Sequence, residues 1–424
     1  MTFLFSGVGG CLFIYFLIKV YQSQPQLLQV FYWPGLVLKL LGGISVGLVY
    51  SYYYTVGDTF GFFTDAQRVA GLIEDNSGDY FSFLLFGNET YPIVQHLTNV
   101  QERSLFLVKI LSVILFFAFN SYWISSIYLS IISFLGSWYL FTKINLNYKM
   151  VVVSSAISLL ALPSFIFWSS GVVKESLASA AIMFLAGVFL LLIKKQKPKN
   201  WEWIICLISV LILWNLKYYW AALFIPAALT SLIVIRYVRV FFSTDLKSWE
   251  LLIWMAVFSC LVGIASTIHP NFYLNRLLTV IVENHNAYAM VSGDRPSIHF
   301  SDLEPTWISI LVNSPWALIS GLFRPFVFEA STPFQIVIGV ENLVLLLLII
   351  YNLRYVSHFW NSHDRLLIFG TLIYILLLAI FLALSTPNFG TLSRYRVGFL
   401  PFLFFLLLCY PIGRFSRFFK LTLP

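Results

Sequence analysis

The chain has 424 residues, of which 59% are apolar and 10% are charged, against roughly 45–50% and 25% in an average soluble domain. This composition excludes a soluble enzyme, because the apolar residues exceed what one globular core buries and match roughly ten or more membrane spans. The net charge of +8 would indicate nucleic acid only if the basic residues formed a patch. The four cysteines have no pair spacing, so we expect neither a disulfide framework nor a cysteine metal site.

In chain order, charge-free apolar runs fall at residues 1–18, 40–57, 110–142, 150–173, 176–193, 203–216, 218–235, 251–275, 342–353, 366–393 and 397–413. Most are long enough to cross about 30 Å of hydrocarbon as a helix, and none alternates as the strands of a membrane barrel would. The first run lacks a small-residue cleavage pattern and precedes more membrane sequence. We therefore expect a retained span rather than a removed signal peptide.

The distribution of charge predicts the orientation of these spans. The positive-inside rule places the basic residues of the short connections in the cytoplasm; these are Lys19, Lys39, Lys143, Lys149, Lys194, Lys195, Lys197, Lys199, Arg236, Arg239, Lys247, Arg354, Arg365, Arg414, Arg417 and Lys420. Most acidic residues lie in the remaining connections and belong to the outer face. The basic and the acidic residues fit one topology only if residues 104–119 and 306–323 do not cross the membrane. We therefore expect these two stretches to be helices that lie at the outer interface.

The sequence thus predicts an all-α, polytopic transmembrane helix bundle of about 11 spans plus outer interfacial helices, with the N-terminus outside and the C-terminus cytoplasmic. We expect a single integral membrane domain over residues 1–424, with large outer loops at 56–122 and 268–333. The inner loops are short and basic, which places any chemistry at the outer face. Because the basic excess is a signal of topology, we expect membrane lipids and no nucleic acid as partners.

The first candidate residues, Asp58 and Asp65, follow the second span in an aromatic stretch. A carboxylate held at the mouth of a span can act as a general base on a sugar hydroxyl or as a metal ligand. Seven residues apart, the two would share one face of a helix. The alternative is that Asp58 caps a helix after Gly57 and that Asp65 is solvated.

The second candidate is the pair Lys174 and Glu175, in a tight outer turn after Pro163. Charges this close to a bilayer are costly unless they have partners, which favours a function. The alternative is an interfacial salt bridge, with Ser169 or Ser170 capping the next helix.

The third candidate group combines Arg324 and Glu329 with Arg394 and Arg396, at the outer ends of late spans. Arginine suits bidentate phosphate recognition, so these residues predict a phosphate site at headgroup depth. The alternative is snorkelling to lipid headgroups. The six histidines show no metal-ligand spacing, and there is no phosphate-binding glycine loop or nucleophile elbow.

Together these motifs resemble the GT-C superfamily of polytopic glycosyltransferases that use polyprenyl-phosphate sugars. The likeness rests on Gly57-Asp58 followed by Phe62 and Ala66, on the interfacial stretch 104–119, on the turn from Pro163 to Glu175, and on Arg324 to Glu329 with Arg394-Tyr395-Arg396. It covers most of the chain, although each motif is short.

The resemblance implies that Asp58 is a general base toward the acceptor hydroxyl, with Asp65 as a second catalytic candidate. The sugar would transfer with inversion from an undecaprenyl-phosphate donor to a glycan or lipid-linked acceptor at the bacterial cytoplasmic membrane. Arg324, Arg394 and Arg396 would neutralise the leaving phosphate, and Lys174 and Glu175 would orient sugar or phosphate. Glu329 is a further candidate for binding the substrate or its phosphate. Two departures are Phe62, where relatives usually have tyrosine, and Lys174-Glu175, where some have an acidic metal ligand. No cofactor is certain, and a divalent metal stays open.

Two alternatives remain open. A polysaccharide repeat-unit polymerase also joins lipid-linked sugars outside and often carries arginine in two outer loops, but its first loop needs no acid. A transporter or lipid flippase would need polar residues at mid-bilayer and broken helices in related halves. The sequence has no internal symmetry, and its main charge within an apolar stretch, Lys109, is predicted at the interface.

Overall fold

The computed structural model describes residues 2–54, 57–148, 150–238, 249–293 and 295–418. Every regular element in these ranges is helical, and one isolated bridge pairs Ser297 with Asn388. This confirms the predicted all-α class. Lys149, Arg239, Lys247 and Lys420, predicted in inner loops, lie outside the described residues.

Six helices of the described chain are long and apolar enough to cross a membrane. They are α2 (Gln26–Tyr52), α6 (Tyr122–Asn147), α9 (Lys174–Ile193), α10 (Asn200–Ile233) with η3 (Val234–Val238), α15 (Pro333–Asn352) with η7 (Leu353–Tyr355) and α16 (Val356–Asn361), and α17 (Arg365–Ser385). A seventh span results if α18 (Phe389–Tyr395) with η8 (Arg396–Gly398) and α19 (Leu400–Phe418) count as one helix bent by 64°. The chain is thus a multi-pass membrane protein, with fewer qualifying helices than the eleven spans predicted.

Broken helices explain part of this difference. The predicted span over residues 150–173 is divided into α7 (Val152–Ala156), the π-helical turn η2 (Ile157–Ala161) and α8 (Pro163–Trp168). The predicted spans 203–216 and 218–235 are joined in α10, whose backbone leaves the helical region at Lys217 (φ −143°, ψ 60°). Two further apolar helices are α1 (Thr2–Gln22) and α12 (Glu250–Ala265). They are not among the six, because the apolar stretch in each is shorter than a span requires.

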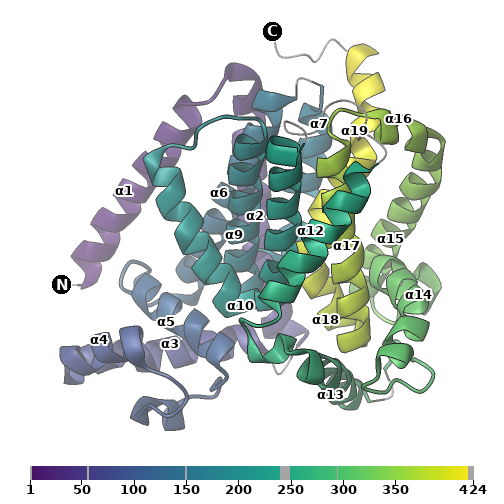
Figure 1. Ribbon diagram of the computed structural model, residues 1–424. Helices are drawn as coiled ribbons and strands as arrows, with labels where there is room; N and C mark the ends of the chain where they lie inside the picture. Colours follow the sequence, from purple (N-terminus) through teal and green to yellow (C-terminus); the bar gives the residue numbers. More distant parts are fainter. Residues whose placement is uncertain (1, 55–56, 149, 239–248, 294, 419–424) are drawn as a thin grey trace.

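The two sets of loops that the charges separate lie at opposite ends of the bundle (Figure 1). One end, called the α3 end, carries α3 (Asp58–Asp75), α4 (Ser77–Phe86), η1 (Pro92–His96), α5 (Glu102–Leu115), η5 (Pro270–Phe272), α13 (Leu274–Ser292) and α18. The other, called the α16 end, carries α16 and the connection from α9 to α10. The segments predicted not to cross form α5 and α14 (Trp307–Phe323), and neither is among the six helices. η6 (Val327–Glu329) follows α14.

Small residues allow the central helices to approach closely. A Cβ at Gly136 of α6 would lie 2.5 Å from the carbonyl oxygen of Ala180 in α9. Such contacts are typical of membrane helix pairs, where packing and interhelical hydrogen bonds replace the hydrophobic drive. The main cluster of buried apolar residues runs from Leu17 to Leu408, so one core joins the first and last helices.

Lys39 lies elsewhere than predicted. The chain turns from α1 to α2 around Pro25, so Lys39 falls in the middle of α2 and is fully buried rather than placed in an inner connection. Its ammonium donates to the Ser133 hydroxyl (3.1 Å) and to both the carbonyl (3.5 Å) and the hydroxyl of Ser169. The ring of Phe165 lies 4.0 Å from it. The positive-inside rule assigns a lysine to a cytoplasmic connection from the sequence alone, and it does not detect partners of this kind inside the bundle.

Candidate functional site

Three of the predicted site residues meet at the α3 end, although the sequence separates them widely. The guanidinium of Arg394, in α18, donates from Nε to Glu175 Oε2 at 2.7 Å. Its Nη1 lies 3.4 Å from Asp58 Oδ2, at the start of α3. One arginine therefore joins a carboxylate of α9 to a carboxylate of α3.

Lys217 is a fourth member that the sequence reasoning did not single out. Its Nζ lies 2.6 Å from Glu175 Oε1, and it stands 3.5 Å from the ring centre of Tyr395. The break in α10 at this residue brings the lysine to the α3 end. The sequence does mark Lys217, because it is a lone lysine between two apolar runs, at a turn predicted on the outer side. The positive-inside rule does not account for a lysine there.

Lys174 stands beside this group at the first position of α9. Its ammonium donates to the Ser104 hydroxyl of α5 at 2.8 Å and lies 5.2 Å from the ring of Phe62. It also interacts electrostatically with Arg394, Glu175, Arg103 and Asp58. The N-cap of α9 is Val173 without a side-chain cap, so neither Ser169 nor Ser170 caps this helix.

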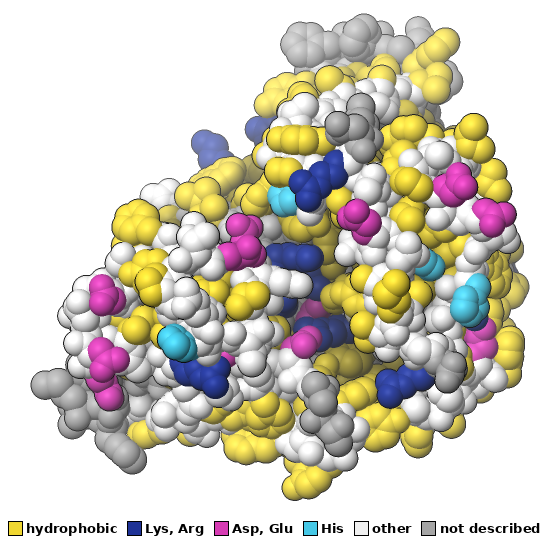
Figure 2. Space-filling view, turned by 90° about the horizontal axis from the view of Figure 1, so that it is seen from below, with side chains coloured by type: hydrophobic (Ala, Val, Ile, Leu, Met, Phe, Trp, Pro, Cys, Tyr) yellow, Lys and Arg dark blue, Asp and Glu magenta, His cyan; other side chains and the backbone are white. Residues whose placement is uncertain are grey.

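We name Asp58, Lys174, Glu175, Lys217 and Arg394 the Glu175 cluster. Three cations and two carboxylates leave it with a net charge of +1. Its members differ in exposure, because the side chains of Glu175, Lys217 and Arg394 are 0%, 3% and 10% exposed whereas that of Asp58 is 61% exposed. Seen from the α3 end, the molecule has a hollow with basic and acidic side chains inside it (Figure 2). Buried cations at the bottom of a hollow can bind an anion, and an accessible carboxylate beside them can accept a proton from a second substrate.

The backbone explains why a glycine precedes Asp58. Gly57 is the N-cap of α3, and a Cβ there would lie 2.1 Å from the ring of Tyr50. Tyr50 in turn interacts electrostatically with Arg394 and Asp58. In the first turn of α3, the Asp58 carboxylate is stabilised by the helix dipole.

Asp65 does not join the cluster. Its side chain is fully buried and accepts hydrogen bonds from the backbone and side chains of Thr98 and Asn99 at 2.9–3.0 Å, with Arg68 at 3.4 Å. These bonds hold the segment after η1 against α3. Its oxygens are thus occupied within the fold, and this position does not support the predicted catalytic role of Asp65.

Arg324 and Glu329 are paired with each other. Their closest atoms, Nη2 and Oε1, are 2.6 Å apart, and Glu329 also accepts from the backbone N–H of Phe326 at 2.8 Å. Arg324 lies 4.9 Å from the ring of Phe389, just before the cluster's Arg394 in α18. Arg324 is thus held by Glu329 beside the Glu175 cluster, and its predicted phosphate contact stays a prediction.

Arg396 is also engaged within the fold. It is 1% exposed and donates to the carbonyls of Leu322 (2.6 Å) and Arg324 (3.3 Å), where α14 ends. A cation at the C-terminus of a helix satisfies free carbonyls and opposes the dipole. Its predicted contact with phosphate is therefore not supported by its position.

Two further observations bear on ligands. Tyr288 of α13 and Tyr395 of α18 share a hydrogen bond between their hydroxyls at 3.0 Å, so α13 contacts the residue next to Arg394. Within the described ranges, no three side chains among His, Cys, Asp and Glu converge as a metal site.

Comparison with protein-family models, with curated proteins and with solved structures found no match for this chain. The geometry of the Glu175 cluster is therefore the basis on which a function is inferred.

Proposed function

We propose that the chain is a membrane glycosyltransferase that transfers a sugar from a polyprenyl-phosphate donor to a glycan or lipid-linked acceptor at the α3 end, the outer face of a bacterial cytoplasmic membrane. The observation that carries the proposal is Arg394, which joins the buried Glu175 to the exposed Asp58. A GT-C-like site needs a carboxylate beside an anion-binding cation, and these residues provide both.

In the proposed reaction, the Asp58 carboxylate accepts the proton of the acceptor hydroxyl. The acceptor oxygen then forms a bond to the anomeric carbon from the face opposite the phosphate. The bond between that carbon and the phosphate oxygen breaks, and the phosphate leaves with the electron pair. Arg394 and Lys174 stabilise the charge that develops on the phosphate, while Glu175 and Lys217 hold Arg394 in place.

The test uses the full-length chain in liposomes with a panel of undecaprenyl-phosphate sugars and host lipid-linked acceptors, and measures release of undecaprenyl phosphate. We expect Asp58→Asn to lower the rate by roughly 10²–10⁴-fold, as for a general base, with donor affinity little changed. Arg394→Gln is expected to weaken donor binding as well. The matched control, Asp75→Asn at the exposed end of the same helix, retains activity. Full activity of Asp58→Asn would refute the mechanism and favour the polymerase.

A transporter or flippase is the second candidate, favoured by two observations. Lys39 is an ionisable residue buried in the middle of a spanning helix, and the π-helical turn η2 interrupts the predicted span over residues 150–173. Intramembrane charges and broken helices are typical of transport pathways. Translocation of a fluorescent lipid by proteoliposomes, abolished by Lys39→Met but retained in Asp58→Asn, would support transport over transfer.

A further inference from the structure

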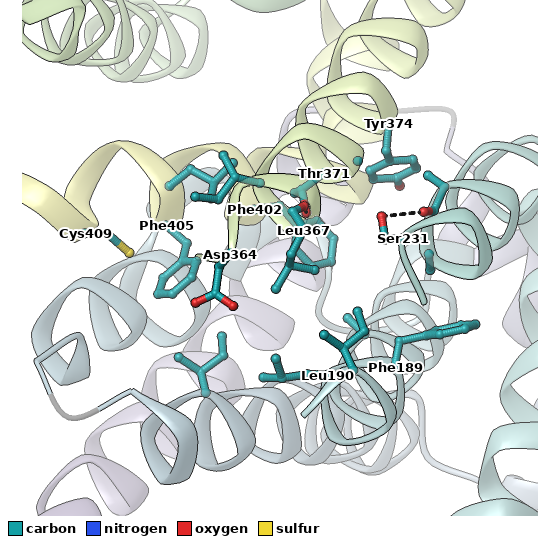
Figure 3. Close-up of a pocket in the computed structure, with 18 of the residues that line it drawn as sticks. Phe189, Leu190, Ser231, Asp364, Leu367, Thr371, Tyr374, Phe402, Phe405 and Cys409 are labelled. Carbon is teal, nitrogen blue, oxygen red and sulfur yellow. Dashed lines mark hydrogen bonds between the residues drawn. The ribbon is translucent and has the colours of Figure 1, made fainter. Parts of the chain in front are cut away.

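A cavity of about 330 Å³ lies between α6, α9, α10, α17 and α19, toward the α16 end. Its walls are largely aliphatic and aromatic, and Figure 3 shows Phe189, Leu190, Leu367, Phe402 and Phe405 around the space. No member of the Glu175 cluster lines it. The cavity is thus a second feature, separate from the candidate active site.

The polar atoms in the wall are already paired inside the protein. The Ser231 hydroxyl donates to the carbonyl of Ala227 (2.9 Å) and accepts from Trp254 Nε1 (3.1 Å). Thr371 donates to the carbonyl of Leu367, and Tyr374 to that of Gly398, each at 2.8 Å. A polar ligand would lose hydration here without gaining hydrogen bonds, so the cavity suits a hydrocarbon.

Charges stand at one edge of the cavity. The carboxylate of Asp364, on the same side as Phe405 and Cys409 in Figure 3, pairs with Lys194 Nζ at 2.9 Å. Both side chains are about a quarter exposed, at 24% and 23%. Lys195, the next residue after Lys194, is exposed, and Arg236 donates to the carbonyl of Leu192, two residues before Lys194, at 3.3 Å. Three cations and one carboxylate give this edge a positive charge.

We propose that the cavity holds a hydrocarbon chain of an anionic membrane lipid, whose headgroup lies at Lys194, Lys195 and Arg236. An apolar cavity of about 150 Å³ already takes up benzene, and filling a void restores dispersion contacts that its lining lacks. The positive edge distinguishes an anionic lipid from a zwitterionic one by charge complementarity. This inference does not depend on the proposed function.

The experiment places the full-length chain in nanodiscs that contain phosphatidylglycerol with a diazirine at the end of one acyl chain. Parallel nanodiscs contain the same chain on phosphatidylcholine. After irradiation, mass spectrometry of peptides locates the labelled residues.

Ala228→Phe and Ala186→Phe fill the cavity from α10 and α9. Ala256→Phe, on the exposed face of α12, is the matched control. Lys194→Gln tests the headgroup contact, with Lys197→Gln as its control.

We expect phosphatidylglycerol to label peptides of α10, α17 and α19 that line the cavity. Either filling variant lowers this labelling at least fivefold, Ala256→Phe leaves it unchanged, and Lys194→Gln lowers it at least threefold. Labelling confined to lipid-exposed residues, and equal in the filling variants, would overturn the proposal. Equal labelling by phosphatidylcholine would overturn its anionic part. If both filling variants misfold, an unchanged melting temperature of delipidated wild type on adding phosphatidylglycerol would overturn it as well.

Discussion

At the scale of single residues, Glu175 organises the candidate site. It is fully buried and pairs with two cations, Lys217 and Arg394, that come from helices distant in sequence. Removing one partner of a buried ionic group is costly because the remaining charges have neither water nor a counter-ion. Glu175 is therefore needed for the fold as well as for the position of Arg394.

We expect Glu175→Gln to lower the free energy of unfolding by about 3–5 kcal/mol. Thermal unfolding in detergent, followed by tryptophan fluorescence, measures the change. Glu74→Gln, on the exposed surface of α3, should alter stability by no more than about 0.5 kcal/mol. Glu175→Gln combined with Lys217→Met should recover part of the loss, and a double variant as unstable as the single one would contradict the ionic explanation.

Lys39 leads to the opposite expectation. Its hydroxyl partners keep other bonds, because Ser133 pairs with Ser179 (3.1 Å) and Ser169 donates to the carbonyl of Phe165. Replacing a buried ion by an apolar side chain of similar length removes the cost of dehydrating it. We expect Lys39→Met to be neutral or stabilising within about 1 kcal/mol, and Lys39→Glu to prevent folding. A loss above 3 kcal/mol in Lys39→Met would show that the ammonium itself stabilises the bundle.

At the scale of elements, α13 is fixed over the α17–α18 junction by polar contacts. His285 Nδ1 lies 3.0 Å from the carbonyl oxygen of Leu384, and Ile298 N–H donates to the carbonyl of Pro387 at 3.0 Å. Asn388 donates to the Ser292 hydroxyl at 3.0 Å. These bonds hold the second outer loop against the hairpin that carries Arg394.

The attachment of α13 should depend on pH through His285. Burial lowers the pKa of His285 below its ordinary value of 6.5, and His299 adds to this effect. The folded state therefore binds the proton less readily than the unfolded one. Stability is complete above pH 6.5 and falls as the pH drops from there toward the lowered pKa. The protection factors of the α13 amides, which correct hydrogen exchange for its intrinsic dependence on pH, should fall between pH 7 and pH 5 in the wild type, and less so in His285→Gln. An equal fall in both would assign the effect to another group.

At the scale of the whole molecule, charge and hydropathy predict much of the architecture. The all-α class and the opposite ends for basic and acidic loops follow from the sequence, because burying a charge in lipid is costly wherever it occurs. Helix breaks are less visible, since the hydropathy of residues 150–173 is unbroken while the backbone divides into three pieces. The chemistry of Asp58, Glu175 and Arg394 makes each a candidate, but no pattern along the chain indicates that they meet. Partners such as Glu329 for Arg324 depend on side-chain packing, which hydropathy does not report.

Orientation in the membrane is predicted by the same charge pattern. In a cysteine-less variant, Asp79→Cys on α4 should react with a membrane-impermeant maleimide in intact spheroplasts. Lys197→Cys, between α9 and α10, should react only after permeabilisation. The reverse result would place the α3 end in the cytoplasm and remove access to outer-face acceptors.

The break at Lys217 also links the two ends of the molecule. The helical segment that starts there continues past Phe224, Ala227 and Ser231, which line the apolar cavity. From Lys217 to Ser231 this segment, which contains Pro226, rises about 21 Å at 1.5 Å per residue. One stretch of chain therefore supplies both a member of the Glu175 cluster and part of the wall of the apolar cavity.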